Sequence, residues 1–101
     1  MQPQPEDFVF DKLTMSAFEG TPLQIAIRDA GLSALAICGI AMEIGIEPTC
    51  WHAADIGIVP ILVEHACGHG DVEAARRSVE SLRLSGDAII TDVAEALAAL
   101  V

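Results

Sequence analysis

Three short apolar runs, separated by segments with helical signals, constrain the fold of this chain more than any other feature. The run at 34–40 (ALAICGI) is apolar throughout, and further runs occupy 59–63 and 88–90. A run that is apolar at every position is typical of a strand covered on both faces, as in parallel sheets. The apolar run FVF at 8–10 is a candidate for one more strand, so we expect about four strands.

Each of these runs is followed by a segment with signals for the start or end of a helix. The residues that carry these signals are Thr21, Pro22 and Gly31 in the first segment, Pro48 in a helix from about 47 to 57, Asp71 and Gly86 in the third, and Thr91 or Asp92 before the last. Alternating strands and helices predict right-handed parallel crossovers with helices on both sides of the sheet. The expected fold class is therefore α/β, a three-layer α/β/α sandwich with about four mostly parallel strands.

The length of 101 residues predicts a single domain over 8–101, preceded by a flexible, proline-rich arm at 1–7. Hydrophobic residues make up 52% of the chain, with a mean hydropathy of +0.50. Because a short chain buries a smaller share of its surface than a long one, this apolar content indicates burial against a second chain.

The net charge of −10 repels phosphate groups, so we expect neither nucleic acid nor an anionic membrane surface as a partner. No apolar run is long enough to span a bilayer, and the start of the chain lacks the pattern of a signal peptide. The three cysteines are an odd number at irregular spacing, which favours a reduced, cytoplasmic protein.

Three sequence segments, taken in order, resemble the isochorismatase-like cysteine hydrolase superfamily, which includes nicotinamidases and N-carbamoylsarcosine amidases. They are DKLTMSAFEGT at 11–21, CGIAMEIGIEPT at 38–49 and VEHAC at 63–67. The first is similar to the lysine segment of that family, the second to its nucleophile segment, and the third to the end of its next strand. The resemblance runs from about Phe8 onward and implies the C-terminal part of a Rossmann-like fold.

The resemblance also implies an Asp-Lys-Cys triad, in which Lys12 matches the lysine and Gly45 stands in the position of the cysteine. Ala41 and Met42 match positions where a cis peptide helps to build the oxyanion hole, to which the backbone at Gly45 would contribute. The aspartate, like the metal ligands of nicotinamidase-like members, belongs to strands of the family with no counterpart here. Since glycine has no side chain, covalent catalysis at position 45 is excluded.

These matches predict a catalytically degraded hydrolase that binds a small molecule or a partner at the former active-site edge, without a cofactor. Two alternatives stay open, namely a hydrolase completed by a second chain and an oligomerisation or scaffold domain. In the sheet of the resembled family, the absent strands lie beside the strand that matches Ala34–Ile40. This strand would then be an exposed apolar edge, which predicts a homodimer through Ala34–Ile40.

A second pattern, His65-x-Cys67-x-His69, follows a predicted strand. Alternation in an extended segment would place the three side chains on one side, and thiolate and imidazole suit zinc or copper. The alternative is a flexible glycine-containing turn without metal, which we favour. Cys50 with His52 is a further candidate nucleophile and base, but two residues apart on a helix they point in different directions, which favours a structural role for Cys50.

Overall fold

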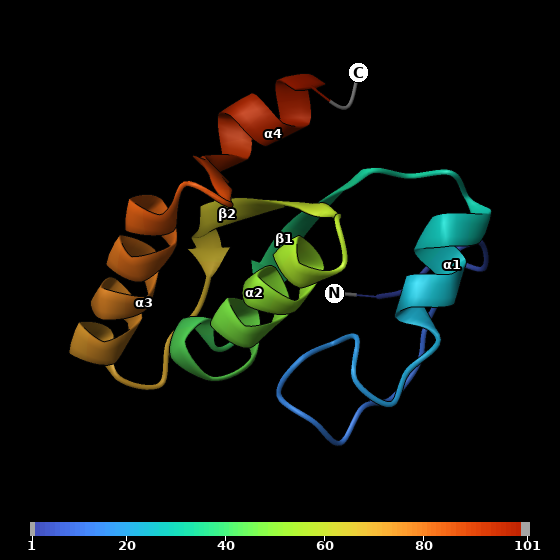
Figure 1. The fold of residues 1–101 in the computed structure, drawn as a ribbon, viewed down its shortest axis with the longest axis horizontal. Coiled ribbons are helices and arrows are strands. Elements are labelled where there is room, and N and C mark those ends of the chain that lie inside the picture. Colours follow the sequence, from blue (N-terminus) through green and yellow to red (C-terminus); the bar gives the residue numbers. More distant parts are fainter. Residues whose placement is uncertain (1, 100–101) are drawn as a thin grey trace.

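The computed structural model describes residues 2–99, and its centre is a parallel sheet (Figure 1). The strands β1 (Ala34–Gly39), β2 (Val59–Cys67) and β3 (Ile89–Thr91) pair in the order β1-β2-β3. Ile37 on β1 lies opposite Leu62 on β2, which lies opposite Ile90 on β3. The predicted α/β class and parallel pairing are confirmed, and β1 is an edge strand.

The expected strand at 8–10 is wrong, so the sheet formed by the described residues has three strands and not about four. Phe8 and Val9 are each 66% exposed, and the ring of Phe8 packs edge-to-face on that of Phe10. A run of three residues is stabilised as a strand only by pairing with a neighbour. No strand lies beside this run within residues 2–99, so its apolar residues contact each other instead.

Within residues 2–99, five helical segments precede, connect or follow the strands: α1 (Leu23–Asp29), the π-helical turn η1 (Met42–Ile46), α2 (Glu47–Asp55), α3 (Val72–Ser85) and α4 (Val93–Ala99). Asp71 caps α3 by accepting a hydrogen bond from the backbone N–H of Ala74 at 2.8 Å, and Gly86 ends it with φ of 76°. Asp92 caps α4, as Glu95 N lies 2.8 Å from its carboxylate. The longest of these helices has 14 residues, and no helix within residues 2–99 has the length and apolarity to cross a bilayer.

The main core lies between the sheet and the helices α2 and α3, which lie side by side in Figure 1. Its buried residues are Ile37, Met42, Ile46, Cys50, Leu62, Val79 and Leu82. The opposite face of the sheet is less covered. There α4 contacts β2, but the alternate side chains Ala36, Cys38 and Ile89 are exposed. Helices therefore bury one face of the sheet well and the other only in part.

A second apolar cluster holds the N-terminal segment and α1 against the end of α2. Phe18, Ile27, Ala53 and Ile58 are all buried in it. Ala53 is on α2, while Phe18 ends the segment that runs from Lys12. This packing places the segment 12–18 across one side of η1 and α2.

Candidate functional site

Lys12 and Gly45, the two triad positions predicted from the sequence, lie next to each other. The Lys12 ammonium donates hydrogen bonds to the carbonyl oxygens of Thr14 at 2.7 Å and Met15 at 3.2 Å. A Cβ atom on Gly45 would lie 3.8 Å from Lys12 Nζ and 3.3 Å from the Met15 carbonyl oxygen. A side chain at position 45 would therefore begin close to both the Met15 carbonyl and the Lys12 ammonium.

The backbone around Ala41 forms the N-terminal end of η1. The Ile40–Ala41 peptide is cis. The N–H of Met42 donates to Gly68 O at 2.8 Å, and the N–H of Gly45 donates to Ala41 O at 3.0 Å. Of the three backbone groups predicted to resemble an oxyanion hole, those of Met42 and Gly45 are thus already engaged with protein carbonyls.

The sequence interpretation missed a serine–histidine contact beside these residues. The Ser16 hydroxyl lies 2.7 Å from His52 Nδ1. Thr49 adds a second link, because its hydroxyl accepts from Ala17 N at 2.9 Å and donates to Gly45 O at 2.7 Å. The contact of Ser16 with His52 joins residues 36 positions apart, so no local spacing in the sequence signals it. The contacts fix the segment 12–18 on η1 and α2.

The other side of η1 and α2 is attached to α3 by two glutamates. Glu43 accepts hydrogen bonds from the backbone N–H of Gly70, at 2.9 and 3.0 Å to its two oxygens, and from that of Asp71. The hydrogen bond from Gly70 is the main cause that lowers the pKa of Glu43. Glu47 accepts from the Ser78 hydroxyl at 2.6 Å and from the Trp51 indole N–H at 3.0 Å.

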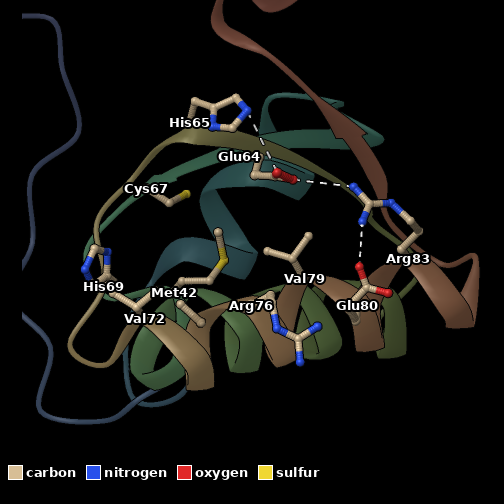
Figure 2. A pocket seen from close by; sticks show the side chains of 11 residues that line it. Met42, Glu64, His65, Cys67, His69, Val72, Arg76, Val79, Glu80 and Arg83 are labelled. Carbon is tan, nitrogen blue, oxygen red and sulfur yellow. Dashed lines mark hydrogen bonds and ion pairs between the residues drawn. The ribbon is translucent and has the colours of Figure 1, made fainter.

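His65, Cys67 and His69 do not form a metal site with each other or with other groups. Within residues 2–99, no three or more His, Cys, Asp or Glu side chains gather closely enough to hold a metal ion. The physical reason is an irregularity in pairing: Ile37 opposes Leu62, yet Gly39 opposes Cys67, so β2 bulges between them. The bulge breaks the alternation on which the prediction rested, and the two imidazoles stand apart in Figure 2.

Two of the cysteines are poor nucleophiles because of burial. Burial raises the pKa of the Cys50 thiol to about 11. Burial also raises the pKa of Cys67, whose sulfur donates to Val63 O at 3.4 Å. His52 contacts Ser16 and the Phe18 ring and not Cys50, in agreement with a structural role for Cys50.

Comparison with known proteins gives consistent matches. Residues 1–95 match the family model of the isochorismatase domain. The chain is 31% identical over 76 residues to the isochorismatase family protein YecD of Escherichia coli O157:H7, covering 75% of this chain and 40% of YecD. It is 33% identical over 85 residues to the ureidoacrylate amidohydrolase RutB of Methylorubrum extorquens, covering 80% of this chain and 34% of RutB.

Solved structures agree on the fold. An isochorismatase-like hydrolase from Alkaliphilus metalliredigens superposes with a TM-score of 0.91 at 17% identity, covering 100% of this chain and 54% of that one. An N-carbamoylsarcosine amidase from Thermoplasma acidophilum gives a TM-score of 0.77 at 25% identity, with coverages of 90% and 51%. The chain therefore spans no more than 54% of the length of these two structures or of the two curated relatives.

Proposed function

Because this chain belongs to the isochorismatase family, we propose that it is a catalytically degraded, hydrolase-like member that binds a small molecule or a partner at the former active-site edge. The observation that carries the proposal is the geometry at position 45. A Cβ there would face the Lys12 ammonium at 3.8 Å, yet glycine offers no group that could attack a carbonyl. Position 45 therefore faces the matched lysine but has no nucleophile, and the Met15 carbonyl oxygen, 3.3 Å from such a Cβ, has closed in on the space that a side chain would need.

The hydrogen bonds of the remaining groups support this proposal. Lys12 donates to the carbonyls of its own segment, at Thr14 and Met15, so its ammonium stabilises the loop. The N–H groups of Met42 and Gly45 are occupied by Gly68 O and Ala41 O, and an oxyanion would have to displace these partners. What survives at this edge is an ordered lysine without a nucleophile beside it, which is an arrangement suited to binding and not to turnover.

The proposal predicts that the purified chain releases no ammonia from nicotinamide or N-carbamoylsarcosine above a buffer blank. The physical reason is the missing nucleophile at Gly45. A Lys12→Met variant serves as the control for contaminating amidases. Ammonia release by the wild type that is lost in Lys12→Met would overturn the proposal, whereas equal release by both proteins would identify a contaminant.

A second candidate function is that of an oligomerisation domain, and the free edge of β1 favours it. Within residues 2–99, β1 pairs with β2 alone, so one row of its backbone N–H and C=O groups has no strand partner. Ala36 and Cys38 on this strand are exposed. Such an edge pairs readily with another strand. We propose that a second copy of the chain pairs along β1, giving a homodimer.

The dimer proposal predicts a particle of twice the 10.6 kDa chain mass in light scattering. The double variant Ala36→Lys, Cys38→Lys should shift it to a monomer, because edge lysines oppose strand pairing. Leu84→Lys is the matched control, since Leu84 is 89% exposed on α3 and lies away from β1. A monomeric wild type, or a dimer that survives both edge lysines, would contradict pairing through β1.

A further inference from the structure

A cavity of about 370 Å³ lies between the C-terminal part of β2, η1 and α3. It is on the other side of η1 from Gly45. Met42 lines it from η1, and Glu43 beside Met42 anchors that side of η1 to Gly70 before α3. Gly45 instead faces Lys12 and Met15. The cavity is therefore a separate site from the Lys12–Gly45 edge.

The floor of the cavity is apolar and contains two sulfur atoms. Met42, 3% exposed, and Val79, 9% exposed, form its buried part. Ala75 and the half-buried Cys67 complete it, with the Cys67 side chain on the cavity side of β2 in Figure 2. Burial raises the pKa of Cys67, so the thiol is uncharged at neutral pH. Thioether and thiol groups on an apolar surface make favourable contacts with aromatic rings.

The charged residues at the rim are paired with one another. Arg83 donates to Glu80 at 3.2 Å and to Glu64 at 3.4 Å, and Arg76 pairs with Glu73 at 2.7 Å. Glu64 and Glu80 line the cavity together with both arginines, whereas Glu73 lies outside the lining, so each guanidinium group at the rim already has a carboxylate partner. An anionic ligand would have to compete with these carboxylates in a chain of net charge −10, and a cationic one with the arginines. An uncharged ligand does not have to compete with either the carboxylates or the guanidinium groups.

Two imidazoles also line the cavity, and the Nε2 atom of His65 lies 3.9 Å from a carboxylate oxygen of Glu64. Both histidines are close to Cys67 in sequence, and in Figure 2 His65 lies above Cys67 and His69 below it. A neutral imidazole offers one hydrogen-bond donor and one acceptor. We propose that this cavity binds a small, uncharged, planar aromatic molecule with its ring on the Met42–Cys67 floor and its polar edge toward the two histidines.

The size of the cavity agrees with this class of ligand. Its volume falls at the lower end of the range of about 300–1,000 Å³ found for small-molecule sites, which suits one or two rings. The site requires nothing from Lys12 or Gly45, so it stands independently of the proposed function of the former active-site edge.

The test uses three probes of similar size and different charge: benzamide, benzoate and benzylammonium. We expect benzamide to bind the purified chain with a Kd on the order of 1 mM, as for a ligand of so few atoms, and both charged probes to bind at least about tenfold more weakly. In ¹⁵N-resolved NMR titrations, benzamide should shift the backbone signals of Met42, Cys67, Ala75 and Val79 and leave those of Ser16 and Gly45 in place.

Ala75→Leu should weaken benzamide binding by at least about tenfold, since its longer side chain fills the floor. Ala74→Leu is the matched control on the same helix, because Ala74 does not line the cavity. The NMR mapping uses the wild-type protein, so it tests the proposal even if the Ala75→Leu variant does not fold. No benzamide binding, shifts confined to Ser16 and Gly45, or equal or tighter binding of a charged probe would each overturn it.

Discussion

Gly45→Cys is expected to create the most reactive thiol of the chain. The new side chain would begin 3.8 Å from Lys12 Nζ, and a neighbouring ammonium group lowers a thiol pKa by stabilising the thiolate. Its alkylation by iodoacetamide should therefore reach half its maximal rate below pH 8.5, the ordinary pKa of cysteine. Cys50, with a pKa of about 11, should react on the order of a thousandfold more slowly at neutral pH.

Lys12→Met in the Gly45→Cys background provides the control. Removing the ammonium should move the alkylation midpoint of Cys at position 45 to higher pH, and site-resolved mass spectrometry separates this thiol from the exposed Cys38. The Cβ would sit 3.3 Å from Met15 O, so the segment must shift by a few tenths of an ångström. If the midpoint does not depend on Lys12, the lysine does not act on position 45 in solution.

Leu82→Ala is expected to cost about 2–5 kcal/mol of unfolding free energy, because it leaves a cavity in the main core. Leu82 on α3 is 1% exposed and packs in the cluster that contains Leu62 and Val79. For a domain of about 5–15 kcal/mol total stability, that loss is a large share of the free energy of unfolding.

Leu84→Ala tests whether the effect comes from burial. Leu84 is two residues away on the same helix but 89% exposed, so its truncation should change stability by about 0.5 kcal/mol or less. Urea titrations followed by circular dichroism measure both variants. Equal losses for the two leucines would show that α3 does not pack on the sheet through Leu82.

The strands after residue 34 and the caps of α3 were predictable from the sequence because each depends on local chemistry. Continuous apolar runs predicted β1 and β3. Asp71 and Gly86 predicted the two ends of α3, and the structure has the helix ends at these residues. The run at 8–10 has the same composition as a strand but lacks a neighbour within residues 2–99. Strand pairing depends on the assembled sheet, so a run of three apolar residues could not predict whether a strand forms there.

The candidate site was predictable only where the family resemblance supplied positions. Lys12 and Gly45 do lie together, although 33 positions apart in the numbering. The pairing of β2 is irregular between Leu62 and Cys67, and His69 lies beyond the end of this strand. Neither feature has a sequence signal in this segment. The links from Ser16 to His52 and from Glu43 to Gly70 span long sequence separations, so neither follows from local spacing alone.

The contact of Trp51 with Glu47 makes the junction of α2 and α3 visible to spectroscopy. The chain has one tryptophan and no tyrosine, so its near-ultraviolet emission arises almost entirely from one indole. That indole donates to the same carboxylate that accepts from Ser78 on α3. A change in the distance between the two helices alters the polarity around the fluorophore directly. The protein therefore carries an intrinsic optical reporter at the point where its two main core helices meet.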